Sequence, residues 1–192
     1  MAEFNVLVVC LGNICRSPLA ERVLTLRLQE LMGAESASIH VSSAGVRAMV
    51  GSPMDADAAA QLQRLGGDPA GFVSTQLTVE ACNDADLVLT ATQELRSRVL
   101  EDAPRALKRT FTIRELATIA RSEVLLDRAA ASGADFVRRS ASWRGSTEVA
   151  DFDVPDPIGR PEEFHREVAD LLDRECRSIA TALAQAWSPN PL

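Results

Sequence analysis

The stretch VLVVCLGNICRSP at residues 6–18 decides how this chain folds. It begins with a continuous apolar run, which is typical of a buried parallel strand, and apolar residues recur at helical spacing after Pro18. A short loop between a buried strand and a helix can turn its backbone N–H groups inward, where they surround an anion. The segment therefore predicts a strand, an anion-binding loop and a helix, in that order.

Two side chains give this loop a chemical character. Cys10 and Arg16 are separated by five residues. A thiolate is a strong nucleophile, and loop N–H groups and a helix N-terminus lower the pKa of a thiol placed among them. The planar guanidinium of Arg16 can bind two phosphate oxygens at once. We therefore expect Cys10 to attack phosphorus and Arg16 to hold the phosphate.

The remaining loop residues are expected to shape the loop and to bind phosphate. Gly12 tolerates positive φ, and Asn13 adopts the left-handed conformation more readily than most residues do. Ser17 is a favoured helix N-cap, and Pro18 suits the first helical position. The expected phosphate-binding residues are Leu11, Gly12, Asn13, Ile14, Cys15, Arg16 and Ser17.

The hydrophobic pattern along the whole chain predicts an α/β fold with helices on both faces of a sheet. The expected strands are residues 4–9, 38–43, 86–90 and 110–112, and the expected helices are 18–32, 55–66, 93–102, 114–131 and 161–187. Residues 132–153 are the least regular part and are expected to form a loop. The length of 192 residues predicts a single domain over residues 1–192.

Composition excludes several classes of protein. The net charge of -7 argues against a nucleic-acid-binding surface. No stretch has the length of a membrane span, and no signal-peptide pattern opens the chain, so we expect a cytoplasmic protein without a membrane partner. Of the four cysteines, Cys82 and Cys176 fall in helical patterns and are expected to be buried. There is no C-x-x-C pair, and His40 and His165 are far apart in sequence, so no metal site is predicted.

Five motifs resemble those of the low-molecular-weight protein tyrosine phosphatase family. They are VCLGNICRSPLAE at 9–21, SSAGV at 42–46, GSPMD at 51–55, DADLVLTAT at 84–92 and DVPDP at 153–157. The resemblance implies a four-stranded parallel sheet in the order 2-1-3-4 and a cysteine-dependent phosphatase that needs no metal or other cofactor. It also implies that hydrogen bonds of Asn13 hold the loop in shape, with Ser43 as a partner; a strand-end turn is the other role open to Ser43.

The leaving oxygen of a phosphate ester needs a proton, which a general acid supplies. Asp156 lies between Pro155 and Pro157, which restrict the local backbone, and it stands where the family keeps its acid. Asp151 and Asp153 remain alternatives.

Two more loop side chains have possible roles at the sulfur. Cys15 is expected either to form a protective disulfide with oxidised Cys10 or to be a small residue packed under the loop. Ser17 is expected to donate a hydrogen bond to the Cys10 sulfur, in addition to capping the helix.

Departures from the family pattern bear on the substrate. Positions where many relatives carry aromatic residues hold Met49, Ile158 and Gly159, and the chain contains no tyrosine. We expect Leu11, Met49 and Ile158 to form an apolar pocket wall, so the preference for phosphotyrosine is expected to be weak. The expected substrate is a phosphorylated protein, such as a bacterial tyrosine kinase, with phosphate or another oxyanion bound in the loop.

Two other functions compete with the phosphatase. An arsenate reductase could use the same loop with an external thiol, because arsenate mimics phosphate; residues 87–92 lack the extra cysteine of thioredoxin-coupled reductases. A non-catalytic phosphate-binding module would keep the loop and lose the nucleophile or the acid. The presence of Cys10, Arg16 and Asp156 together favours an enzyme.

Overall fold

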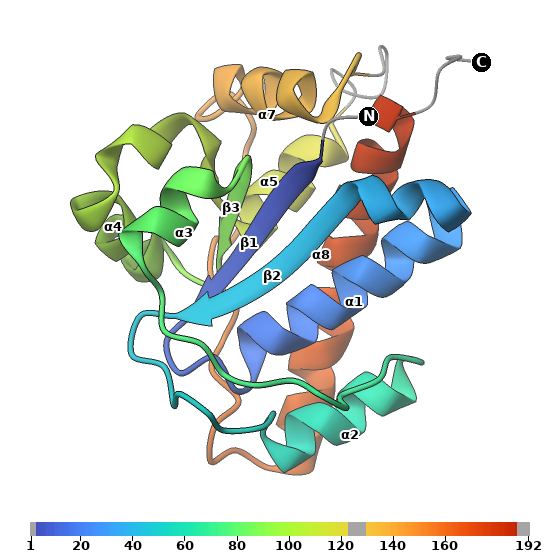
Figure 1. Ribbon diagram of the computed structural model, residues 1–192, viewed down its shortest axis with the longest axis vertical. Helices are drawn as coiled ribbons and strands as arrows, with labels where there is room; N and C mark the ends of the chain where they lie inside the picture. The colour runs from blue at the N-terminus through green and yellow to red at the C-terminus, as the bar shows by residue number, and fades with distance from the viewer. Residues whose placement is uncertain (1–2, 123–129, 188–192) are drawn as a thin grey trace.

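The computed structural model describes residues 3–122 and 130–187. At its centre lies a four-stranded sheet in the order β2-β1-β3-β4, in which every neighbouring pair is parallel (Figure 1). This confirms the predicted fold class and strand order. The strands span Phe4–Cys10 (β1), Ile39–Gly45 (β2), Leu87–Thr90 (β3) and Thr110–Thr112 (β4).

Helices connect and cover the strands. The α-helices span Arg16–Met32 (α1), Ala56–Arg64 (α2), Val79–Asp84 (α3), Gln93–Asp102 (α4), Ile113–Ala120 (α5), Gly133–Ser142 (α7) and Glu162–Trp187 (α8), and the 3-10 helices span Gly33–Ser38 (η1) and Pro104–Arg109 (η2). The predictions of helix at 18–32, 55–66, 93–102 and 161–187 are confirmed to within two residues at each end. No helix in residues 3–122 or 130–187 is long and apolar enough to cross a membrane.

Two sequence-based expectations are wrong. Helix α7 lies in the region 132–153, which was expected to be a loop, because the Ser132 side chain caps the helix by accepting the Asp135 N–H and the helix buries Phe136 and Val137. The helix expected over 114–131 ends at Ala120. Residues 130 and 131 are not helical, and residues 123–129 lie outside the described part of the chain.

Alternation along β1 builds a hydrophobic core on each face of the sheet. Phe4, Val6 and Val8 belong to the larger cluster, which includes apolar residues of α1, α5 and α8. Leu7 and Val9 belong to the smaller cluster, which includes residues of α3 and α4. Figure 1 shows α1 and α8 on one side of the sheet and α3 and α4 on the other. Cys82 and Cys176 are buried in these clusters, as predicted.

The packing of α1 can be tested by cavity formation. Leu24 is fully buried in the larger cluster, whereas Leu31 on the same helix is 50% exposed. We expect Leu24→Ala to lower the free energy of unfolding by about 2–5 kcal/mol and Leu31→Ala to change it by about 0.5 kcal/mol or less. Chemical denaturation measures both, and equal losses would contradict the assignment of the buried face.

Candidate active site

Outward hydrogen bonds hold the loop that follows β1. The carbonyl groups of four loop residues accept backbone N–H donors from the segment after β2. A trans peptide is planar, so its C=O and its N–H point in opposite directions. The N–H groups of residues 11, 12, 13 and 15 therefore face the centre of the loop. The four bonds, of 2.9 or 3.0 Å, join Val46 N–H to Cys10 O, Arg47 N–H to Leu11 O, Met49 N–H to Gly12 O and Asp55 N–H to Ile14 O.

Asn13 is buried and holds this loop in shape. It is the only non-glycine residue in the described part of the chain with positive φ, at 52°, and its side chain is fully buried. Its Nδ2 donates to Ser17 Oγ and to Ser43 Oγ, both at 2.8 Å, and its Oδ1 accepts the Thr75 N–H at 2.7 Å. Gly12, which was also expected to use positive φ, does not.

The Cys10 sulfur lies at the C-terminal end of β1 and accepts two hydrogen bonds. Ser17 Oγ donates to it at 2.9 Å and the Asn13 N–H donates at 3.2 Å. Both donors therefore meet the sulfur beside the N-terminus of α1.

The expected N-cap role of Ser17 is not observed. Helix α1 already begins at Arg16, with Cys15 at the N-cap position and no side-chain cap. The Ser17 hydroxyl is engaged with Cys10 and Asn13 instead, so it is unavailable to cap the helix.

Glu21 extends this network and was not singled out by the sequence analysis. Its Oε2 accepts the Ser43 hydroxyl at 2.6 Å, so hydrogen bonds run from Glu21 through Ser43, Asn13 and Ser17 to the Cys10 sulfur. Burial raises the pKa of Glu21. The available signal was spacing, because Ser17 and Glu21 are four residues apart and share one face of α1.

Two small residues support the loop from outside and were also missed. A Cβ atom on Gly45 would lie 2.6 Å from the Leu11 carbonyl oxygen, so only glycine lets β2 approach this closely. Ser74 is buried and donates to Gly12 O at 3.2 Å. Gly45 falls within the quoted motif at 42–46, which was the signal for it.

Arg16 joins the loop to the segment that carries Asp156. Its guanidinium is buried and donates to Val154 O at 3.2 Å through Nη1 and to Asp156 Oδ2 at 2.7 Å through Nη2. The Val154 N–H in turn donates to Ala91 O at 2.8 Å, just after β3. The fold therefore brings Arg16 and Asp156 into direct contact at the carboxyl edge of the sheet.

The two alternative aspartates are engaged elsewhere. Asp153 accepts the Gln93 N–H at 2.8 Å, at the start of α4. Asp151 pairs with Arg114 at 2.5 Å. The backbone N–H of Asp153 and the Arg114 guanidinium both lower the pKa of Asp151. Of the three aspartates, Asp156 is the one paired with Arg16.

Cys15 is a free, buried thiol behind the loop. Burial, followed by the nearby Asp55 carboxylate, raises its pKa. A thiol in this environment is a poor nucleophile.

The three expected pocket-wall residues are accessible. Leu11, Met49 and Ile158 are 41%, 53% and 49% exposed. Met49 is tied to the loop through its bond to Gly12 O, and the Ile158 N–H donates to Asp156 Oδ1 at 3.3 Å. These residues therefore adjoin the loop after β1 and the segment that carries Asp156.

Comparison with known proteins places this geometry in a family. The family described as "Low molecular weight phosphotyrosine protein phosphatase" matches residues 5–127. The low molecular weight protein-tyrosine-phosphatase Ptp of Acinetobacter johnsonii is 36% identical over 109 residues, which are 57% of this chain and 71% of that protein. The enzyme Wzb of Escherichia coli (strain K12), of the same type, is 31% identical over 179 residues, which are 93% of this chain and 95% of Wzb.

Solved structures show the same architecture. The YwlE arginine phosphatase from Geobacillus stearothermophilus superposes with a TM-score of 0.69 at 29% identity, covering 94% of this chain and 92% of YwlE. Vibrio vulnificus Wzb in complex with benzylphosphonate superposes with a TM-score of 0.65 at 27% identity, covering 94% of this chain and 99% of that one. With a family match over most of its length and a relative above 30% identity that spans nearly all of it, the chain belongs to the low molecular weight protein-tyrosine-phosphatase family.

Proposed function

We propose that residues 1–192 act as one catalytic domain that hydrolyses phosphotyrosine in proteins through a cysteinyl-phosphate on Cys10. The observation that carries this proposal is the environment of the Cys10 sulfur, which accepts two hydrogen bonds within a loop of inward N–H groups. The loop that surrounds the proposed nucleophile is therefore also the proposed phosphate-binding site. None of the relatives named above is a reductase, so nothing favours the arsenate alternative.

The first chemical step transfers the phosphoryl group to sulfur. The Cys10 thiolate attacks phosphorus, the bond to the leaving oxygen breaks, and Asp156 gives that oxygen its proton. Loop N–H groups and Arg16 stabilise the charge on the equatorial oxygens. The Asn13 N–H is directed to the sulfur, so the other loop N–H groups bind the phosphate.

The second step releases phosphate. Water attacks phosphorus, the sulfur–phosphorus bond breaks, and the Asp156 carboxylate takes the proton of the water. The departing sulfur recovers its negative charge, and the Ser17 hydroxyl at 2.9 Å stabilises it. One residue thus serves as acid and then as base, and one hydroxyl assists the leaving thiolate.

Substrate binding is expected to break the ion pair between Arg16 and Asp156. Arg16 directs one guanidinium nitrogen to Asp156 and the other to Val154 O. A phosphate dianion competes with the carboxylate for this guanidinium, because the planar guanidinium can donate two hydrogen bonds to the oxygens of either anion. Binding of substrate would therefore release Asp156 from Arg16 and leave its carboxyl group free to face the leaving oxygen.

The accessible walls favour an aryl ester. Leu11, Met49 and Ile158 offer exposed apolar surface and no charge, which suits a phenyl ring better than a guanidinium group. Relatives differ on this point: Wzb of Vibrio vulnificus binds benzylphosphonate, whereas YwlE is an arginine phosphatase. The absence of aromatic walls leaves the phosphate group as the main source of binding, so the selectivity for phosphotyrosine is low.

The location and the physiological substrate are part of the same proposal. We assign the protein to the cytoplasm, with a tyrosine-phosphorylated protein such as a bacterial tyrosine kinase as its substrate. The redox role of Cys15 stays a prediction, and its raised pKa makes attack on oxidised Cys10 slow.

Asp156→Asn should lower kcat by a factor of about 10² to 10⁴ for substrates with poor leaving groups, because the leaving oxygen no longer receives a proton. The loss should shrink for a nitrophenyl ester, whose leaving group needs little protonation. Steady-state kinetics over a series of aryl phosphates measure this. Asp153→Asn is the matched control; if it shows the leaving-group dependence and Asp156→Asn does not, the assignment of the acid is wrong.

Met49→Trp should raise kcat/KM for a phosphotyrosine peptide by a few-fold to about tenfold, since one ring contact adds roughly 0.5–1.5 kcal/mol. A small alkyl phosphate serves as the comparison substrate and should gain nothing. An unchanged ratio of the two would show that Met49 does not contact the substrate. Faster turnover of a phosphoarginine peptide than of a phosphotyrosine peptide by the unmodified protein would overturn the substrate assignment.

The raised pKa of Glu21 predicts a pH-dependent stability. The folded chain holds this proton more tightly than the unfolded chain, so stability should fall as pH rises from the ordinary value of 4.5 through the raised folded value. Glu21→Gln keeps an acceptor for Ser43 and removes the titrating carboxyl group. The fall in stability that Glu21 causes should therefore be absent in this variant. Denaturation across the pH range measures it, with exposed Glu80→Gln as the control; identical wild-type and Glu21→Gln profiles would contradict it.

A further inference from the structure

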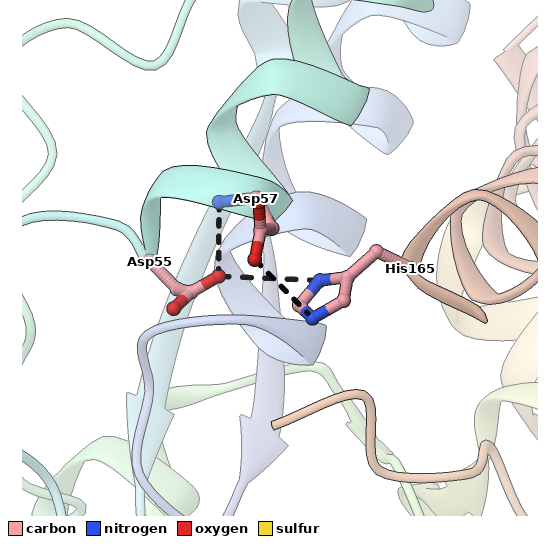
Figure 2. Close-up of side chains that lie close together, drawn as sticks. All are labelled: Asp55, Asp57 and His165. Atoms are coloured by element: carbon pink, nitrogen blue, oxygen red, sulfur yellow. Dashed lines mark hydrogen bonds and ion pairs between the residues drawn. The ribbon is translucent and has the colours of Figure 1, made fainter. Parts of the chain in front are cut away.

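Three side chains from two distant parts of the chain converge behind the phosphate loop. Asp55 precedes α2, Asp57 lies in its first turn, and His165 lies in the first turn of α8. Figure 2 shows the imidazole of His165 facing both carboxylates, with Nδ1 3.9 Å from Asp55 Oδ1 and Nε2 3.8 Å from Asp57 Oδ2. One ligand atom from each residue can be chosen so that all three lie within 4.8 Å of one another.

His165 is buried without satisfying its hydrogen-bonding capacity. Its side chain is 2% exposed, and Nδ1 has no hydrogen-bond partner in the described part of the chain. The two carboxylates face the ring nitrogens, yet both stand beyond hydrogen-bond distance. A buried polar atom of this kind is costly unless something binds it.

We propose that Asp55, Asp57 and His165 bind a divalent transition-metal ion, with Zn²⁺ as the best fit. One imidazole and two carboxylates are ligands that zinc accepts, with water in the fourth position. The two carboxylate charges neutralise the ion. Mg²⁺ and Ca²⁺ prefer oxygen ligands alone, so the imidazole selects against them.

Zinc binding would require only a small movement of the ligand atoms. Zinc bonds of about 2.0–2.2 Å place tetrahedral ligand atoms about 3.3 Å apart, so separations that are now within 4.8 Å must shorten by about 1.5 Å at most. The Asp57 side chain is 58% exposed, which leaves it room to rotate and gives the ion access from solvent, whereas the Asp55 side chain, 28% exposed, is held in place by its hydrogen bonds to the start of α2. The buried imidazole supplies the fixed ligand.

This site is directly connected to the phosphate loop, although it shares no residue with the proposed chemistry. The Asp55 N–H donates to Ile14 O at 2.9 Å, and the Asp55 carboxylate caps α2. His165 lines a small cavity together with Cys15, Arg16 and Pro157. A bound ion would therefore cross-link α2 and α8 immediately behind the loop. Sequence separation hid the site, because His165 and its partners meet only in the folded chain.

The experiment titrates ZnCl₂ into the full chain carrying Cys10→Ser, so that the active-site thiolate cannot compete for zinc. The readout is the imidazole nitrogen spectrum by NMR. The chain has two histidines, and exposed His40 serves as an internal reference. We expect the His165 signals to shift with zinc while the His40 signals do not, and MgCl₂ to shift neither.

Two substitutions of exposed aspartates test whether a carboxylate of the cluster binds zinc. Asp57→Asn should weaken zinc binding by at least about tenfold, and Asp68→Asn, an exposed aspartate just after α2, should leave it unchanged. No change in the His165 signals at about 1 mM zinc would overturn the proposal. Equal shifts of both histidines, or equal affinities of the two variants, would overturn it as well.

Discussion

A backbone N–H group can point into the phosphate loop only if the carbonyl of the same peptide unit points out of it and meets a donor there. The segment after β2 provides those donors for Cys10, Leu11 and Gly12, and the start of α2 provides one for Ile14. Asn13 completes the turn with a left-handed backbone and a fully satisfied, buried amide. The anion site is thus made by the packing of β2, α2 and the loop, and not by the loop alone.

The same constraint places the reactive groups. Because Asn13 is fixed, its side chain orients Ser17, and the Asn13 backbone N–H and the Ser17 hydroxyl both donate to the Cys10 sulfur. The sheet contributes at longer range, since Val154 pairs with Ala91 after β3 and delivers the Asp156 segment to Arg16. The proposed nucleophile, phosphate clamp and acid therefore all lie at the carboxyl ends of the strands, as is usual for ligand sites in parallel α/β sheets.

Local patterns explain which features could be predicted from the sequence. The four strands, most helices and the loop from Cys10 to Ser17 follow from hydrophobic spacing and residue type within short windows. Helix α7 was missed because its amphipathic face is short and stands among glycine and serine residues. The long-range contacts of Arg16 with Asp156, Ser43 with Glu21, and His165 with Asp55 have no local signature. They depend on tertiary packing, which spacing alone does not encode.

The most direct test of the account is the site of phosphorylation during turnover. The protein is mixed with a phosphotyrosine peptide, quenched within the steady state and digested, and the peptide that carries both Cys10 and Cys15 is fragmented in a mass spectrometer. The account predicts one phosphoryl group on Cys10 and none on Cys15. A phosphoryl group on another residue, or steady turnover by the Cys10→Ser protein, would contradict it.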